Sequence, residues 1–189
     1  MELIIKRELI SDKRFCRLFS VGVFIILTAL SAFVRIPLPF TPVPLTLQTF
    51  FVLLSGALLG KKLGTVTQAA YMFLGFTGQQ VFTGLGSGGL YLLGPTGGYI
   101  AGFILASFLA GSLLTEEKQS GPVVFIKLLV ADFIILFTGM LWLKVSMSIS
   151  LSQAWLLGFL PFVAGDILKV ALAAVVYNQL RGRIKEALY

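Results

Sequence analysis

The chain has 189 residues, of which 57% are hydrophobic and only 12% are charged, and its formal net charge is +7. A soluble domain is about 45–50% apolar and about 25% charged, so these few charges cannot form a water-facing surface, and lipid is the expected solvent. The basic residues stand at the ends of apolar runs, which is typical of membrane flanks and argues against nucleic-acid binding. The sequence has no histidine and one cysteine, Cys16, which excludes an internal disulfide and a zinc site of the usual Cys/His type.

Apolar runs separated by short polar or turn-forming segments predict an all-α integral membrane protein with six transmembrane helices in one domain, residues 1–189. Residues 1–17 carry five basic and three acidic residues and are expected at the membrane surface. The expected crossings are residues 18–34, 45–60, 64–82, 96–114, 123–145 and 153–180.

Two segments between the expected crossings are rich in proline or glycine. Four prolines in residues 36–46 remove backbone donors and predict a stiff, extended loop. The 53 residues from 63 to 115 carry no charge; as one helix they would span about 80 Å, so the chain must turn back within them. The glycines of residues 83–89 and 94–99 mark this turn, because glycine permits positive φ.

Six crossings place both termini on one side of the membrane, and the basic residues indicate which side that is. The side of the termini would hold eleven of them: Lys6, Arg7, Lys13, Arg14, Arg17, Lys61, Lys62, Lys118, Arg181, Arg183 and Lys185. The opposite side would hold two, Arg35 and Lys144. This bias predicts that both termini are cytoplasmic, in a multi-pass protein of the cytoplasmic membrane. Irregular backbone in lipid must line a cavity or be buried in protein, so a binding cavity is predicted near the extracytoplasmic side.

Charged residues inside the expected crossings are candidates for function. Asp166 and Lys169 are spaced i, i+3, which puts them on one helix face. Charges at this depth normally face a cavity or each other. The pair is therefore either a self-neutralising structural pair or a polar anchor for a small solute. Lys127 and Asp132 do not share a face well, and we expect structural roles for both, with Lys127 extending to the cytoplasmic surface.

Uncharged polar and aromatic residues leave two readings open. The glutamines in or beside the crossings either cross-link helices or line the cavity: Gln48, Gln68, Gln79 and Gln80. Tyr91 and Tyr99, beside the glycine-rich turn, either stack on a ligand or belong to an interfacial aromatic belt.

Two short motifs resemble nucleotide-binding sites but lack essential parts. GALLGKK, residues 56–62, has three residues between its glycines where a P-loop has four, and Lys62 replaces the Ser/Thr. GLGSGG, residues 84–89, follows an expected membrane helix and not a strand, so it is no dinucleotide-binding fingerprint. The chain therefore shows no ATP-hydrolysing machinery.

Three further motifs occur in order along the chain: IPLPFTPVPLTLQ (36–48), YLLGPTGGYIAGF (91–103), and Gly165-Asp166 followed by Lys169. Together they closely resemble the BioY family, the biotin-specific substrate-binding S components of energy-coupling factor (ECF) vitamin transporters. The resemblance covers nearly the whole chain. It implies a six-helix fold that binds biotin near the outer face as the transported substrate, with no cofactor. It also implies partnership with a transmembrane T subunit and two cytoplasmic ATPase subunits.

The resemblance also implies where the T subunit docks. Family members commonly dock through small residues spaced four apart on the first crossing. In this chain Thr28 and Ala32 are the clean small pair and are the implied docking residues. Ser20 and Gly22 are followed at that spacing by bulky residues.

Biotin carries a ureido ring with two N–H donors and a carbonyl, an apolar thioether ring and chain, and a carboxylate. The resemblance implies that Asp166 accepts the ureido N–H bonds, while Lys169 neutralises Asp166 and donates to the ureido carbonyl. The opposite orientation, with Lys169 on the biotin carboxylate, stays open. The other implied biotin-binding residues are Thr46, Gln48, Gln79, Ser87, Gly88, Gly89, Tyr91 and Tyr99, of which Thr46, Gln48 and residues 87–89 would meet the carboxylate.

Two other functional classes compete with a vitamin-capturing subunit. A passive channel or self-sufficient secondary transporter for a small vitamin-like solute is the first, although the crossings show no clear internal repeat of the kind many secondary transporters carry. An intramembrane enzyme is the second, but the chain has no histidine and no convincing nucleophile–base pair.

Overall fold

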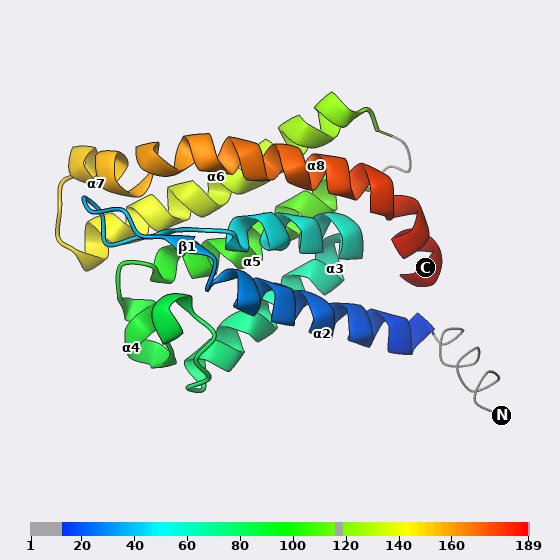
Figure 1. Ribbon diagram of the computed structural model, residues 1–189, viewed down its shortest axis with the longest axis horizontal. Helices are drawn as coiled ribbons and strands as arrows, with labels where there is room; N and C mark the ends of the chain where they lie inside the picture. Colours follow the sequence, from blue (N-terminus) through cyan, green and yellow to red (C-terminus); the bar gives the residue numbers. More distant parts are fainter. Residues whose placement is uncertain (1–12, 116–118, 189) are drawn as a thin grey trace.

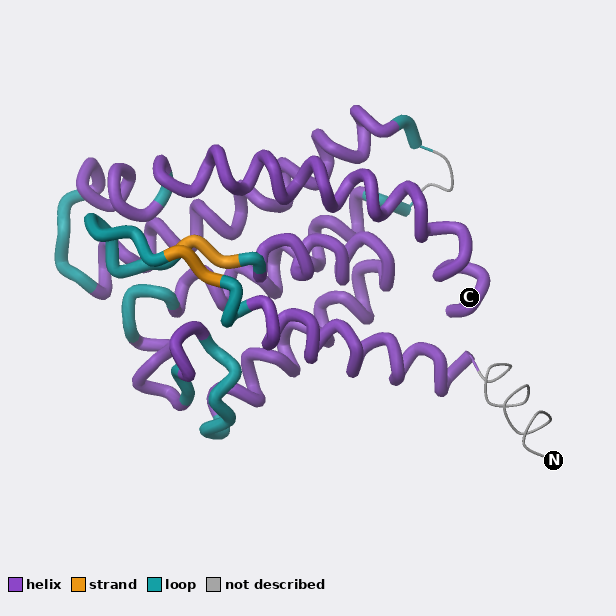
Figure 2. Tube along the Cα trace, viewed as in Figure 1, coloured by secondary structure: helices purple, strands orange, loops and turns teal. Residues whose placement is uncertain are grey.

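The structure, a computed structural model, describes residues 13–115 and 119–188. Nearly all of the described chain is helical, as predicted (Figures 1 and 2). The helices are α2 (Lys13–Ser31), α3 (Gln48–Phe76), α4 (Gly88–Leu93), α5 (Gly97–Leu113), α6 (Gly121–Ser146), α7 (Leu151–Gly158) and α8 (Leu160–Leu188), with a 3₁₀ turn η1 (Thr83–Leu85). Expectations for residues 1–12, 116–118 and 189, and for the side chain of Lys185, lie outside the described residues; the basic residues Lys6, Arg7 and Lys118 are among them.

The described helices have the length and surface of a multi-pass membrane protein. Four helical segments are long and apolar enough to cross a membrane: Lys13–Ser31, Gln48–Phe76, Gly121–Ser146 and Leu151–Ile184. Gly97–Leu113 is a shorter apolar helix. Large apolar side chains point outward, with Leu18 74% and Leu168 73% exposed. Water-soluble proteins rarely expose so much contiguous apolar surface, so lipid is the solvent of these faces.

Helix α3 is two helical arms joined at Gly60, whose φ of 78° and ψ of 170° are not helical. The chain reverses there, and the arms run side by side (Figure 1). A Cβ placed on Gly64 would lie only 2.7 Å from the Cα of Gly56, whereas eight residues along a straight helix span about 12 Å. Only glycine adopts this φ and ψ without strain. The reversal occurs where the sequence predicts the end of the second crossing.

The two arms of α3 pack mainly against α5, and these elements form the centre of the bundle, with α2, α6 and α8 packed around them. Small residues permit this close approach, as is usual between membrane helices. A Cβ on Gly56 would collide with the backbone carbonyl of Ser107 in α5. A Cβ on Gly111 would likewise collide with the backbone of Lys61. The missing side chains therefore set the spacing between α3 and α5.

Hydrogen bonds between side chains join α2, α3 and α5 inside this core. The amide nitrogen of Gln68 donates to the hydroxyls of Ser55 (2.9 Å) and Thr28 (3.4 Å). The hydroxyl of Ser55 lies 3.2 Å from that of Ser107. Gln68 therefore cross-links helices, which is one of the two roles considered for it.

The implied docking pair lies inside the protein and not on its surface. Thr28 on α2 and Ala32 just after its end both have 0% exposed area, because both pack on the rest of the bundle. The expectation that these two residues form a docking surface is therefore wrong. The outward face of α2 carries large apolar side chains instead, among them Phe19, Ile26 and Leu30.

The proline-rich loop is closed at its base into a hairpin. Strands β1 (Arg35–Ile36) and β2 (Leu45–Thr46) pair antiparallel, with Arg35 opposite Thr46 and Ile36 opposite Leu45. The four prolines lie between these strands, where the absence of an N–H does not break the ladder. The glycine-rich segment also differs from the expected plain turn, because it contains η1 and the short helix α4.

The last expected crossing is interrupted between α7 and α8 at Phe159, where φ is −125° and ψ is −63°. Pro161 explains the interruption, because it has no N–H to bond to the carbonyl of Leu157 and its ring would clash with that carbonyl in a continuous helix. Helix α7 is capped at its start, where the Ser150 hydroxyl accepts from the N–H of Gln153 at 3.2 Å.

We predict that Gly56→Ala lowers the free energy of unfolding by about 1–3 kcal/mol, because the added methyl group meets a backbone carbonyl and forces α3 and α5 apart. Gly22→Ala is the matched control, since no atom lies within 4 Å of its Cβ position. Thermal unfolding of both variants in one detergent measures the effect. Equal melting temperatures for the two variants would contradict the packing described here.

Candidate functional site

A cavity lies between the hairpin, the first turns of α3 and α5, and helices α6 and α8. It holds about 480 Å³ of space, its open mouth included. Five of the predicted biotin-binding residues contribute to its lining. The lining residues are Val43, Pro44, Leu45, Thr46, Gln48, Thr49, Thr96, Tyr99, Ile100, Phe103, Ile135, Leu136, Phe162, Asp166 and Lys169.

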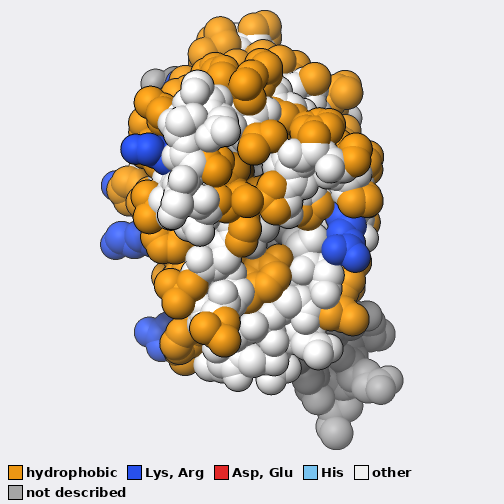
Figure 3. All heavy atoms as spheres, turned by 90° about the vertical axis from the view of Figure 1, so that its left-hand side faces the viewer, with side chains coloured by type: hydrophobic (Ala, Val, Ile, Leu, Met, Phe, Trp, Pro, Cys, Tyr) orange, Lys and Arg blue, Asp and Glu red, His pale blue; other side chains and the backbone are white. Residues whose placement is uncertain are grey.

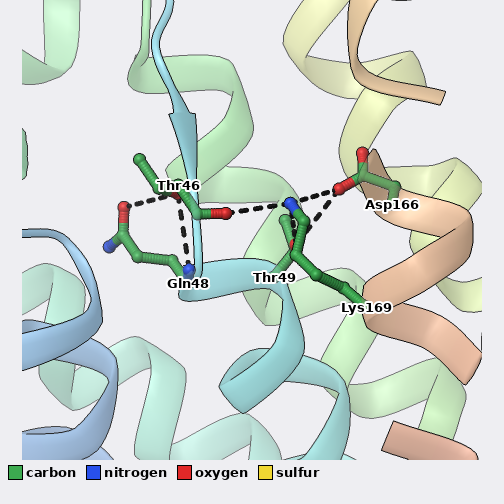
Figure 4. Close-up of polar contacts among 5 residues, drawn as sticks. All are labelled: Thr46, Gln48, Thr49, Asp166 and Lys169. Carbon is green, nitrogen blue, oxygen red and sulfur yellow. Dashed lines mark hydrogen bonds and ion pairs between the residues drawn. The ribbon is translucent and has the colours of Figure 1, made fainter. Parts of the chain in front are cut away.

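Asp166 and Lys169 form an ion pair in this lining (Figure 4), which confirms that they share a helix face. The Lys169 ammonium lies 2.5 Å from Asp166 Oδ1 and donates to the backbone carbonyl of Thr46 (2.8 Å) and the hydroxyl of Thr49 (2.9 Å). All three of its N–H donors therefore have an acceptor. The two side chains are only 11% and 4% exposed, so each charge is neutralised mainly by the other.

Thr49 completes the ion pair and was not singled out from the sequence. Its hydroxyl accepts from Lys169 and donates to Asp166 Oδ1 at 3.3 Å. It stands in the first turn of α3, three residues after Thr46. A hydroxyl one turn from another polar residue in an otherwise apolar crossing is the signal that points to such a role.

The second carboxylate oxygen of Asp166 is available to a ligand. It has no hydrogen-bond partner in residues 13–115 and 119–188, and it is turned away from Lys169 (Figure 4). Because Asp166 lines the cavity, this oxygen is an acceptor for an N–H brought in by a guest molecule, and a charge-assisted bond of this kind is strong.

Gln48 lines the cavity but already has partners for its amide group. Its nitrogen donates to the Tyr71 hydroxyl at 2.7 Å, and its oxygen accepts from the hydroxyls of Thr46 and Thr83, both at 3.4 Å. The Tyr71 hydroxyl in turn donates to the carbonyl of Val81 at 3.0 Å. Gln48 therefore ties the start of α3 to the loop that precedes η1.

Apolar and aromatic side chains make up most of the rest of the lining. Phe103, Phe162 and Leu136 are examples, each no more than 5% exposed. The Tyr99 ring lies 6.1 Å from that of Phe162, and its hydroxyl donates to the carbonyl of Gly158. Tyr99 therefore offers its ring, and not its hydroxyl, to the cavity.

The other five predicted biotin-binding residues do not line this cavity: Gln79, Ser87, Gly88, Gly89 and Tyr91. The glycine-rich segment, residues 83–93, makes contacts within itself and with Phe82 and does not line the cavity. The Tyr91 hydroxyl donates to the carbonyl of Thr83 at 3.1 Å, and its ring stacks on Phe82 at 5.0 Å. Gln79 is exposed beyond the end of α3.

Asp132 is buried beside the ion pair, a placement that the sequence left unexplained. It is 2% exposed, and its Oδ1 has no hydrogen-bond partner in the described part of the chain. The charges that act on it are those of Asp166 and Lys169. Lys127 does not pair with it, because the Lys127 ammonium donates to the carbonyl of Leu113 at 2.9 Å.

We predict that Asp132→Leu raises the free energy of unfolding by about 1–3 kcal/mol, because it replaces a buried carboxyl that has an unpartnered oxygen with an apolar side chain of similar size. Asp166→Leu should lower the free energy of unfolding by about 3–5 kcal/mol, because it leaves Lys169 buried without its counter-ion. Thermal unfolding of both variants without ligand makes the comparison. A loss of stability of similar size in the two variants would show that Asp132 is a paired, stabilising residue.

Known proteins resemble this chain in sequence and in fold. Residues 7–186 match the model of the BioY family. A probable biotin transporter BioY of Pyrococcus horikoshii is 40% identical over 162 residues, which cover 86% of this chain and 94% of the relative. The biotin transporter BioY of Thermotoga maritima is 40% identical over 165 residues, which cover 87% and 95%. The crystal structure of the S-component for biotin from an ECF-type ABC transporter superposes with a TM-score of 0.86 at 29% identity, covering 90% of this chain and 93% of that one.

Proposed function

Because the chain belongs to the BioY family, we propose that it captures biotin in the membrane as the substrate-binding subunit of an ATP-driven ECF-type transporter. One relative is a biotin transporter and the other a probable biotin transporter, and the similar solved structure is an S-component for biotin. One observation on this chain carries the proposal. The Asp166 carboxylate is held by Lys169 through one oxygen and is free at the other, inside a largely apolar cavity.

The ureido ring of biotin fits this carboxylate better than the carboxylate end of biotin does. The ion pair of Asp166 and Lys169 is already neutral, so a neutral group with N–H donors adds hydrogen bonds without adding charge. A second carboxylate would add a buried negative charge. The Lys169 donors all have acceptors, so a bond from Lys169 to the ureido carbonyl requires the release of one of them. The apolar rings of biotin would lie against the aromatic part of the lining.

The proposed topology has six crossings formed by α2, the two arms of α3, α5, α6, and α7 with α8. The start of α2 and the end of α8 lie at one end of the bundle, where the Arg17 Nε donates to the carbonyl of Leu188 at 2.8 Å. The turn between the two arms of α3 lies towards the same end (Figure 1). Most of the described basic residues flank these ends, namely Lys13, Arg14, Arg17, Lys61, Lys62, Arg181 and Arg183. This distribution supports cytoplasmic termini and a cavity that faces the opposite, extracytoplasmic side.

Energy for uptake would come from other subunits of a transporter complex in the cytoplasmic membrane. The partners proposed are a T-type transmembrane coupling subunit and two cytoplasmic ATPase subunits. The near-miss to a P-loop in residues 56–62 supports this division of labour. Thr28 and Ala32 are buried, so they are no longer proposed as the docking residues.

The proposed function predicts that the detergent-purified chain binds biotin tightly and does not bind vitamins that lack a ureido ring. Isothermal titration calorimetry with biotin and a panel of other vitamins measures this. Equal affinity across the panel would contradict the assignment. Uptake of biotin by liposomes that contain this chain alone, without ATPase subunits, would favour a self-sufficient carrier or channel.

We predict that Asp166→Asn and Lys169→Met each weaken biotin binding by about 1.5–3 kcal/mol, which is roughly tenfold or more, because each removes one partner of a charge-assisted network. Lys127→Met is the matched control, since Lys127 is bonded to the end of α5 and does not line the cavity. Calorimetry on all three variants gives the affinities. Unchanged affinity in both site variants would reject the site.

A further inference from the structure

The carboxylate of the ligand cannot be received by the ion pair in the cavity. The Lys169 ammonium already has three acceptors, and two carboxyl groups, Asp166 and Asp132, lie near it. A third carboxylate there would be a buried negative charge without a partner, which is costly in a water-poor site. If the ureido ring occupies Asp166, the flexible chain of biotin carries its carboxylate away from the ion pair, towards the part of the lining that the hairpin forms.

Arg35 is the basic residue of the hairpin, and it is exposed beside the cavity lining, not part of it. It stands on β1, directly opposite the cavity-lining Thr46 of β2. The Arg35 Nη1 lies 2.8 Å from the place where a Cβ on Gly84 would be, so the guanidinium rests on η1 in space that a side chain would fill. The adjacent Thr83 donates to the cavity-lining Gln48. The Arg35 guanidinium therefore lies against Gly84, the residue that follows Thr83, and Thr83 is hydrogen-bonded to the cavity-lining Gln48.

The charge of Arg35 is not compensated in residues 13–115 and 119–188. Among the described residues, no acidic side chain forms an ion pair with Arg35 and no acceptor takes a hydrogen bond from its guanidinium. Among the described side chains at this end of the bundle, Figure 3 shows basic groups and no acidic one. The N-terminal end of α5 adds to the positive potential, because Thr96 lines the cavity and α5 begins at Gly97.

Building on the proposed function, we infer that Arg35 receives the carboxylate of biotin beside the cavity and so selects ligands with an anionic tail. A guanidinium forms two parallel hydrogen bonds with a carboxylate, which gives direction as well as charge. The ligand then spans two polar ends, with the ureido ring on Asp166 and the carboxylate on Arg35, and its apolar middle lies against the aromatic wall. Arg35 is a specificity-determining residue in this arrangement.

The test compares Arg35→Gln with Lys144→Gln, the same loss of charge at the other basic residue assigned to this side. Lys144 lies in the last turn of α6 and not on the hairpin, and like Arg35 it is outside the cavity lining. Calorimetry measures the affinity of each variant and of the wild type for biotin and for biotin methyl ester, whose tail is uncharged. Arg35→Gln should weaken biotin binding roughly tenfold and leave ester binding within about twofold of the wild type. Lys144→Gln should change neither.

Equal weakening of biotin and ester by Arg35→Gln, or no weakening of either, overturns the inference, because a structural role does not distinguish the two ligands. Arg35→Lys keeps the charge and should recover part of the preference for biotin over the ester. If Arg35→Gln fails to fold, the salt dependence of ligand binding by the wild type still tests the inference. Its preference for biotin over the ester should shrink as salt rises, since salt screens a partly exposed ion pair, and a salt-independent preference overturns the inference. A wild type that binds neither ligand overturns the proposed function itself.

Discussion

The ammonium group of Lys169 is the contact on which the site depends. It joins helix α8 to a distant part of the chain, the end of the hairpin and the start of α3. Its acceptors are the carbonyl of Thr46, the hydroxyl of Thr49, and Asp166 on its own helix. A buried ammonium is tolerated only when its charge and its donors are satisfied. The packing of α8 against the start of α3 is therefore determined by these polar contacts as well as by shape complementarity. The contacts use only one carboxylate oxygen of Asp166 and leave the other without a described partner.

Much of the fold follows from the sequence because the length of an apolar run is a local property. The predominance of helix follows from these runs, and the shared face of Asp166 and Lys169 follows from their i, i+3 spacing. For Gln68 the sequence left two roles open, and the structure shows that it cross-links helices. The break at Phe159 was also encoded locally, because Pro161 removes a donor that a continuous helix needs. The number of crossings and their orientation stay predictions, since they depend on the distribution of basic residues.

Other features could not be predicted, because they depend on which distant segments of the chain pack against each other. Small residues spaced four apart indicate that a helix packs closely, but they do not indicate whether it packs on another subunit or on the same chain. Thr28 and Ala32 were therefore assigned to a docking surface, although they face the core of this chain. The glycines of residues 87–89 indicated an irregular backbone but not its path, which is set by the contacts of Tyr91 with Thr83 and Phe82. Thr49 was missed because a single hydroxyl in an apolar helix acquires a role only when another helix brings the charge to it.

The hairpin has only two residues in each strand, so its ladder contributes few hydrogen bonds of its own. Its base is fastened to α8 by one bond, from the Lys169 ammonium to the carbonyl of Thr46. The loop beyond that point contains four prolines, and prolines make a chain stiff. The restricted backbone of this segment leaves few conformations that could compensate for a displacement of the ammonium. The position of the hairpin is thereby linked to that of the Asp166–Lys169 ion pair through one ammonium group.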